Sequence, residues 1–471
     1  MAGETVATIV EAHRAGASPE ATVARAYARI RAHADPAIFI TLRAEADALA
    51  EAKALAARRD ADRALADLPL YGVPVAIKDN IDVAGLPTTA ACPAFAYTPA
   101  KDATCVARLR RAGAIVIGKT NLDQFATGLV GVRTPYGIAR NLFDPALIPG
   151  GSSTGSAIAV AAGLVQLALG TDTAGSGRVP AALGNIVGLK PSFGLVSTAG
   201  VVPACRSIDC VSVLALTVDD AFAALAAIAG ADDADAYSRR RSLGALKDMP
   251  RGARIGVPKP DQREFFGDGA SAAAYDHALA RLARLSAAVV EFDMAPFYEA
   301  ARLLYEGPWV AERYLAARAV IEAKPEAMHP VTRQIILAGA EITAAEAFAA
   351  FYRLEELRRM SEATFRLIDA MALPTVPTVY TVEQVLADPV ALNSALGIYT
   401  NFVNLLDLCA LAVPAAMRAD GTPFGITLVA PAGEDAAVAS IGRAFHAATA
   451  LPLGATGAPQ PALAAKAKVR A

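Results

Sequence analysis

The chain has 471 residues, of which 54% are hydrophobic and 19% charged, and its formal net charge is −2 at pH 7. This composition is typical of a soluble globular protein and lacks the basic excess of most nucleic-acid-binding proteins. The N-terminus has no secretory-signal organisation, and the longest apolar run, residues 157–170, is too short to cross a bilayer, so we expect a cytoplasmic protein with no membrane partner.

Residues 1–66 are predicted to be helical, because Ser18 followed by Pro19 is a favourable helix start and the segment is rich in strong helix formers. Beyond them, short apolar runs alternate with helical stretches. The expected strands are residues 73–79, 114–119, 164–170, 254–258, 287–293, 370–378 and 424–430. This alternation predicts the α/β class, with a large, mostly parallel or mixed sheet covered by helices on both faces.

The chain shows no repeat and no internal linker, which favours one large domain over residues 1–455. Within it we expect N-terminal helices over 1–66, a core over 67–250, and the rest of the sheet over 251–455, with a helical excursion from about 296 to 368 that caps it. Residues 456–471 are low in complexity, which predicts a disordered tail or the start of a linker.

Two familiar motifs are present in the wrong context. Residues 113–120, GAIVIGKT, match a phosphate-binding loop, but their four central residues form the predicted strand itself. Residues 151–155, GSSTG, match the nucleophile elbow of α/β-hydrolases, but a loop rather than a strand leads into Ser153. The five histidines (His13, His33, His277, His329 and His446) are interpreted as surface or structural residues, and the five cysteines have neither disulfide nor zinc spacing.

The segment GTDTAGSGR, residues 170–178, places Ser176 among small residues between a predicted strand and helix. A second serine loop, GGSSTGS, leads into a predicted helix, and its Ser152 precedes Ser176 by 24 residues. One helix and one strand can span that distance, so the two loops can meet at one edge of the sheet. Lysine can activate a serine when burial lowers its pKa, and Lys78 ends a predicted buried strand. The alternatives are a buried Lys78 paired with Asp79 or Asp82, and a glycine turn needed only for its geometry.

Lys78, GGSSTGS and GTDTAGSGRVPAA together resemble the amidase signature family, whose large mixed sheet is sandwiched between helices. The resemblance implies a Ser-cisSer-Lys triad: Lys78 as base, Ser152 as the bridging serine in a cis peptide, and Ser176 as nucleophile. It also implies an oxyanion hole built from the backbone amides of Thr173, Ala174, Gly175 and Ser176, with no metal and no cofactor.

Within this family the chain resembles the allophanate hydrolases, on TDTAGSGRVPAA and on residues 71–99, 119–131 and 200–213. The resemblance implies release of ammonia from allophanate (urea-1-carboxylate), a small anionic substrate. It implies that Tyr305 and Arg313, eight residues apart, hold the substrate carboxylate and that Gly128 lines the pocket. It further implies a homodimer, no nucleic-acid partner, and a further C-terminal domain in full-length enzymes that this chain ends before.

Other interpretations stay open from the sequence. Arg313 could instead be an exposed residue paired with Glu312 or Glu306. A family member with another small amide substrate, of malonamidase or biuret type, or a glutamyl-tRNA amidotransferase subunit would share the core motifs. A non-catalytic nucleotide-binding or scaffolding protein is the alternative from a different class.

Overall fold

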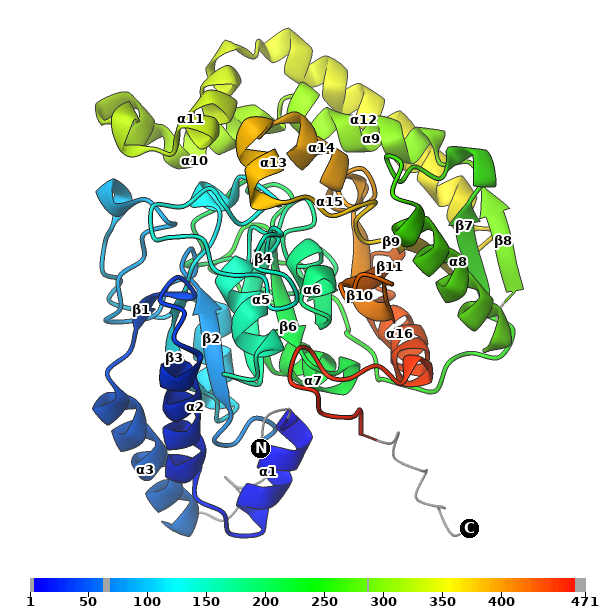
Figure 1. Cartoon of the computed structure of the whole chain (residues 1–471). Helices are drawn as coiled ribbons and strands as arrows, with labels where there is room; N and C mark the ends of the chain where they lie inside the picture. The colour runs from blue at the N-terminus through cyan, green and yellow to red at the C-terminus, as the bar shows by residue number, and fades with distance from the viewer. Residues whose placement is uncertain (1–3, 62–67, 286–287, 462–471) are drawn as a thin grey trace.

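The structure, a computed structural model, describes residues 4–61, 68–285 and 288–461, and within them the chain forms one mixed sheet of 11 strands (Figure 1). The strand order is β1-β3-β2-β4-β6-β5-β10-β11-β9-β7-β8. The bounds are β1 (Phe39–Leu42), β2 (Pro74–Lys78), β3 (Ile115–Thr120), β4 (Leu167–Asp172), β5 (Val187–Lys190), β6 (Cys210–Ala215), β7 (Arg254–Pro258), β8 (Ala288–Phe292), β9 (Ala370–Pro374), β10 (Leu408–Met417) and β11 (Pro423–Pro431). β2 is parallel to β3 and β4, and β7 is parallel to β8 and β9, while the other pairs are antiparallel.

Both faces of the sheet are buried under helices, as the alternation along β2 shows. Val75 and Ile77 belong to one hydrophobic cluster and Ala76 to another, because successive side chains of a strand point to opposite faces. The first face is covered by α4 (Thr104–Arg111), α7 (Val218–Ile228), α8 (Gly269–Arg284) and α16 (Asp435–Thr449). The second is covered by α2 (Pro19–His33), α3 (Glu45–Ala61), α5 (Thr154–Ala161) and α6 (Val179–Leu183). The predicted α/β class is therefore confirmed.

Residues 4–61 of the N-terminal segment are helical, as expected, except for one strand, whereas residues 1–3 and 62–66 of that prediction lie outside the described part of the chain. Ser18 caps α2 by accepting a hydrogen bond from the Glu20 amide, and Pro19 occupies the first turn. α1 (Val6–Arg14) precedes it, but Phe39–Leu42 forms β1 at the sheet edge. A strand of four residues is too short to show a periodicity against its helical neighbours, and the same holds for β5. β6 and β10 are also additional to the predicted strands.

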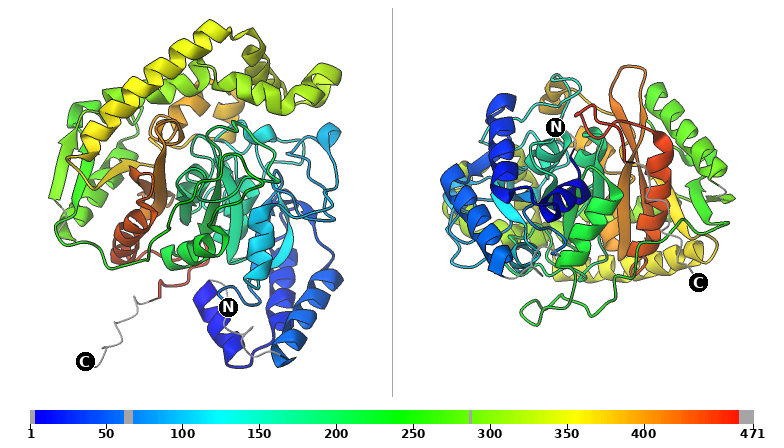
Figure 2. Two further views of the ribbon diagram at one scale, coloured as in Figure 1. Left: turned by 180° about the vertical axis from the view of Figure 1, so that it is seen from behind. Right: turned by 90° about the horizontal axis from the view of Figure 1, so that it is seen from below.

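The predicted helical excursion is a run of four helices: α9 (Ala295–Glu306), α10 (Trp309–Ala323), α11 (Pro330–Leu337) and α12 (Ala344–Phe365). They arch over one edge of the sheet, above the short helices α13 (Val382–Ala387), α14 (Ala391–Leu396) and α15 (Phe402–Leu405) (Figures 1 and 2). In the described ranges no single helix is long and apolar enough to cross a membrane, although one sharply bent pair, Pro330–Glu341 with Ala344–Phe365, passes by length and composition alone.

The C-terminal segment is ordered further than the sequence predicts. Leu453 and Ala458 form an isolated bridge, and the Ala455 amide donates to the Ala161 carbonyl, which ties this segment to the end of α5. Residues 462–471 of the predicted tail lie outside the described part of the chain.

Candidate active site

Lys78, the last residue of β2, lies fully buried and contacts one of the two serine loops. Its Nζ donates to Ser152 Oγ at 2.7 Å and to Thr171 Oγ1 at 2.8 Å. The Gly151–Ser152 peptide bond is cis. Within the described residues neither alternative partner forms an ion pair with Lys78: Asp79 pairs with Lys119 at 3.2 Å, and Asp82 accepts hydrogen bonds from Thr88 and Tyr97. Lys119 is the lysine of GAIVIGKT, the sequence that matches a phosphate-binding loop. In the structure it lies in β3 and forms a buried ion pair with Asp79.

Burial lowers the pKa of Lys78 to about 7, even though the charges of Asp123, Asp172 and Asp209 act in the opposite direction. Removal from water disfavours the ammonium form more than these distant carboxylates favour it. A substantial share of Lys78 is therefore a neutral amine near neutral pH, and that amine can accept a proton.

Ser176 lies in the turn between β4 and α6, directly beside the other serine loop. Its carbonyl accepts a hydrogen bond from the Ser153 amide at 3.2 Å, and its Oγ donates to the Gly128 carbonyl at 3.4 Å. β2 and β4 are adjacent and parallel, so their carboxyl ends bring Lys78 and the Ser176 turn to one edge of the sheet. The two serine loops meet there, as the chain spacing predicts.

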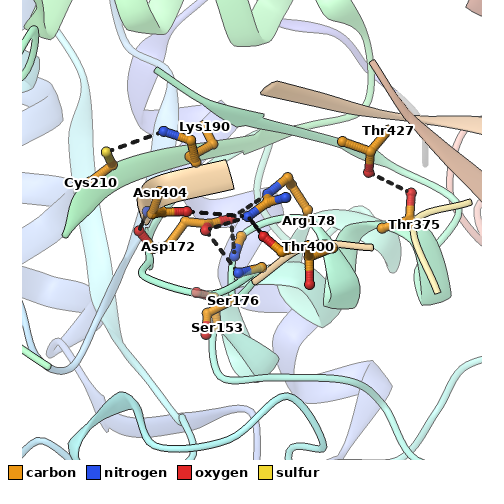
Figure 3. Close-up of polar contacts among 12 residues, drawn as sticks. Ser153, Asp172, Ser176, Arg178, Lys190, Cys210, Thr375, Thr400, Asn404 and Thr427 are labelled. Atoms are coloured by element: carbon orange, nitrogen blue, oxygen red, sulfur yellow. Dashed lines mark hydrogen bonds and ion pairs between the residues drawn. The ribbon is translucent and has the colours of Figure 1, made fainter. Parts of the chain in front are cut away.

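A buried ion pair inside the turn holds it in place (Figure 3). Both Asp172 carboxylate oxygens accept hydrogen bonds from the Arg178 guanidinium at 2.9 Å, and they also accept the amides of Gly175 and Gly177. Burial acts to raise the pKa of Asp172, but the Arg178 charge and these hydrogen bonds outweigh it and lower the pKa. Asn404 on α15 completes the network by accepting from Arg178 and donating to the Asp172 carbonyl.

The backbone amides of the turn fall into two groups. The Gly175 amide donates a hydrogen bond to Asp172. Within the described residues the amides of Thr173, Ala174 and Ser176 donate no hydrogen bond. Asp209 accepts a hydrogen bond from the Thr173 hydroxyl and so anchors the start of this segment. Burial raises the pKa of Asp209 to about 6. Three amides of the predicted oxyanion hole are thus free to donate to a bound oxygen, and Gly175 instead shapes the turn.

Tyr305 and Arg313 lie on two helices rather than on one regular helix. Gly307 and Pro308 end α9 and begin α10, and the Arg313 guanidinium lies 5.3 Å from the centre of the Tyr305 ring. Arg313 is 1% exposed, and its Nε and Nη2 have no hydrogen-bond partner among the described residues. The alternative of an exposed Arg313 paired with Glu312 or Glu306 is wrong, because Arg313 is buried and forms an ion pair with neither carboxylate within the described residues, and Glu312 accepts hydrogen bonds from Ser207.

Several residues that build the site were not predicted from the sequence. Asp172 and Arg178 lie within GTDTAGSGR itself, and two opposite charges flanking a stretch of small residues were a readable signal for a buried pair. Thr171 lies within the same segment but, as an uncharged residue, carried no such signal. Asp123 and Asn404 carried none, because they reach the site only through the folding of distant segments.

The model of the Amidase family matches residues 21–439. The chain belongs to the amidase family. This amidase is 49% identical over 385 residues to urea amidolyase from Saccharomyces cerevisiae, an alignment that covers 80% of this chain and 21% of the relative. The chain thus spans about a fifth of the length of that protein. It is also 38% identical to a glutamyl-tRNA(Gln) amidotransferase subunit of Symbiobacterium thermophilum, over 89% of this chain and 91% of that relative.

Among solved structures, the amidase superposes on Kluyveromyces lactis allophanate hydrolase with a TM-score of 0.89 and 41% identity. The match covers 95% of this chain and 73% of that one. The fold is therefore that of amidase signature enzymes, and the chain is homologous to Saccharomyces cerevisiae urea amidolyase and to Kluyveromyces lactis allophanate hydrolase.

Proposed function

We propose that this amidase hydrolyses the terminal amide of allophanate and releases ammonia. The observation that carries the proposal is Arg313 on α10, a buried guanidinium with two nitrogens that have no partner among the described residues. It contacts the same loop whose Gly128 carbonyl accepts the hydrogen bond of Ser176. A buried cation without a carboxylate partner is costly unless a ligand supplies the anion. The similarity to Kluyveromyces lactis allophanate hydrolase points to allophanate, an amide that carries a carboxylate.

The proposed reaction begins with proton removal from Ser176. Its Oγ attacks the amide carbon while the proton passes through Ser152 to the neutral Lys78 amine. The amides of Thr173, Ala174 and Ser176 donate to the oxyanion, and the C–N bond then breaks as Lys78, through Ser152, returns a proton to the departing nitrogen. Water, deprotonated along the same path, attacks the acyl ester, so that ammonia and N-carboxycarbamate are the products. Tyr305 and Arg313 hold the carboxylate throughout, and Gly128 lines the pocket by its backbone.

The first test concerns the triad. Ser176→Ala and Lys78→Met are expected to abolish ammonia release from allophanate with unchanged circular dichroism, because no other described group provides the nucleophile or the base. Ser361→Ala, on α12, is the matched control. Full activity in either triad variant would overturn the mechanism.

The second test concerns the carboxylate. Arg313→Met is expected to lower kcat/KM for allophanate by about 100-fold or more, chiefly through KM, and to affect a neutral amide far less. Arg318→Met, an exposed arginine on the same helix, is the matched control. Equal losses on charged and neutral amides would contradict the carboxylate role and favour another small amide of malonamidase or biuret type.

A second candidate, glutamine amide hydrolysis for a tRNA-bound partner, is favoured by the 38% identity to an amidotransferase subunit of which this chain covers 91%. Glutamine also carries a carboxylate, but at a greater distance from its amide. Ammonia release from glutamine at a higher kcat/KM than from allophanate would select this function.

The same proposal places the chain in a wider context. We infer one amidase domain over residues 1–455, a cytoplasmic location, and a role in nitrogen supply from urea or related compounds, with no nucleic-acid partner. A homodimer is also proposed, supported by aromatic side chains of α12 that stand in solvent: Phe348, Phe351 and Tyr352 are 59%, 44% and 68% exposed.

A further inference from the structure

Thr127 lies between the two parts of the proposed site, the anion-binding arginine and the nucleophile. It is fully buried in the loop that follows the short turn Gln124–Ala126. Arg313 Nη1 donates to Thr127 Oγ1 at 3.0 Å and to the neighbouring Ala126 carbonyl at 3.3 Å. The next residue, Gly128, accepts the hydrogen bond of Ser176 Oγ. Successive residues of one loop therefore contact the guanidinium and the nucleophile.

The hydroxyl of Thr127 is itself oriented. It donates to the Phe125 carbonyl at 3.2 Å, so its remaining lone pairs are available to Arg313. A threonine hydroxyl has one donor, and using it on a fixed carbonyl makes the oxygen an acceptor for the guanidinium. Nη1 is thus held by the loop, while Nε and Nη2 of Arg313 have no hydrogen-bond partner in the described part of the chain.

The loop that carries Thr127 is held from two further directions. The Asp123 carboxylate accepts hydrogen bonds from the amides of Val130, Gly131 and Arg133, and these bonds close the loop on itself. The Arg133 guanidinium, 1% exposed, donates to the Thr127 carbonyl at 3.0 Å and to the Pro389 carbonyl of a distant segment. Arg133 forms no carboxylate ion pair in the part of the chain that is described, so it binds the loop through backbone oxygens. Several independent hydrogen bonds therefore fix the position of Thr127.

We propose that Thr127 is a specificity-determining residue, which sets the distance between the Arg313 guanidinium and Ser176 and thereby selects amides whose carboxylate lies one atom from the scissile carbonyl. This inference rests on the proposed carboxylate role of Arg313. Thr127 acts through Arg313 and does not touch the reacting atoms, so it is a positioning residue. Loss of its acceptor would leave Nη1 of the guanidinium with the weaker Ala126 contact alone and free to shift.

The test uses malonamate, malonamide and succinamate. Malonamate and malonamide differ only in the carboxylate, and succinamate moves that carboxylate one carbon further away. Thr127→Val, which removes the acceptor and keeps the shape, is expected to lower the malonamate-to-malonamide ratio of kcat/KM by about tenfold or more, mainly through the KM of malonamate. It is also expected to narrow the preference for malonamate over succinamate.

Two variants control the experiment. Thr127→Ser keeps the hydroxyl and is expected to restore the ratio to within about threefold of the unmodified enzyme, on the same hydrogen-bond argument. Thr332→Val makes the same change at another fully buried threonine, on α11, whose hydroxyl has no hydrogen-bond partner among the described residues, and should leave both ratios unchanged. Circular dichroism and thermal unfolding establish that each variant folds. If Thr127→Val does not fold, Thr127→Ala, which also lacks the acceptor, is compared with Thr127→Ser.

The outcomes separate the two proposals. An unmodified enzyme without preference for malonamate over malonamide would overturn the carboxylate role of Arg313, and with it this inference. A clear preference that Thr127→Val retains would overturn the role of Thr127 alone. A loss of kcat on all three substrates in equal proportion would mean that Thr127 only supports the structure of the loop, and would also overturn the inference.

Discussion

The lysine at the end of β2 has an environment suited to a base, because burial brings its pKa to about 7 from an ordinary value of 10.5. The base form of Lys78 is the neutral amine, so its population falls about tenfold for each pH unit below that pKa. Protonation does not disrupt the contact with Ser152, since either form can donate to that oxygen. The pKa therefore affects the rate more directly than it affects the geometry.

We accordingly expect kcat/KM for the amide substrate to rise with pH through an apparent pKa of about 7 and then to level off. The profile is measured between pH 5 and pH 9, with a substrate whose own ionisation lies outside that range. A rate that stays constant from pH 5 to pH 9 would show that Lys78 is not the group whose protonation limits the reaction.

For individual residues, the sequence predicts the candidate catalytic side chains better than it predicts the contacts that hold them in place. Lys78, Ser152 and Ser176 could be proposed because they lie in compact motifs, and the structure places them at one edge of the sheet. The free donors of Arg313 could not be predicted, because they depend on burial by segments nearly 200 residues away: its Nη1 contacts Ala126 and Thr127.

The turn between β4 and α6 packs so closely against β6 that Gly177 has no room for a side chain. A Cβ atom added to Gly177 would lie 2.4 Å from Ser212 Oγ and 2.6 Å from Ser212 Cβ, on β6. The backbone of Gly177 is not in the left-handed region, so the constraint is space alone. The absence of a side chain at position 177 is thus explained by the close approach of β6.

Gly177→Ala is expected to destabilise the protein by about 1–3 kcal/mol, the usual range for overpacking a tight core. The Gly177→Ala/Ser212→Gly double variant removes the atoms that clash and should recover most of that loss. Urea unfolding of the two single variants and the double variant forms a cycle. Additive effects in that cycle would contradict direct contact between the two positions.

Across the whole molecule, most of the apolar strands and the helical run α9–α12 were predicted, whereas β10, an apolar strand of ten residues, and the order of the strands in the sheet were not. β5 pairs with β10, more than 200 residues later, and β1 joins the edge beside β3. Such pairings depend on non-local packing, which a local hydrophobic pattern does not encode. The run α9–α12 was recognisable by its length, but the break at Gly307 and Pro308 became informative only when the positions of Tyr305 and Arg313 were known.

The proposed homodimer is testable through the exposed aromatic face of α12. Phe348 and Tyr352 lie one turn apart, with their ring centres separated by 6.3 Å, so they form one apolar surface. If this surface is buried between two copies, Phe348→Glu is expected to shift the mass measured by light scattering from dimer to monomer. Phe266→Glu, at another exposed phenylalanine, is the control. A monomeric unmodified protein would contradict the proposal.

The stability of the whole protein is expected to depend on pH through His446, a histidine buried in α16. Burial lowers the pKa of His446 to about 4, against an ordinary value of 6.5. Between these values the unfolded chain binds the proton and the folded protein does not, so stability is lost as the pH falls from 6.5 to about 4. The full effect is about 3 kcal/mol. Asp220, whose pKa burial raises to about 6, contributes with the opposite sign.

His446→Gln isolates this contribution, because the aspartates titrate equally in both proteins. The unfolding free energy of each is measured by denaturant titration at pH 7, 6, 5 and 4.5. As the pH falls, the unmodified protein should lose more unfolding free energy than the variant, so the difference between the two should change in favour of the variant. This expectation follows from the greater number of protons bound by the unfolded chain in this range, whatever the glutamine costs in packing at pH 7. A difference that stays constant from pH 7 to pH 4.5 would mean that His446 is protonated to the same extent in both states, and that the folded protein accommodates its charge.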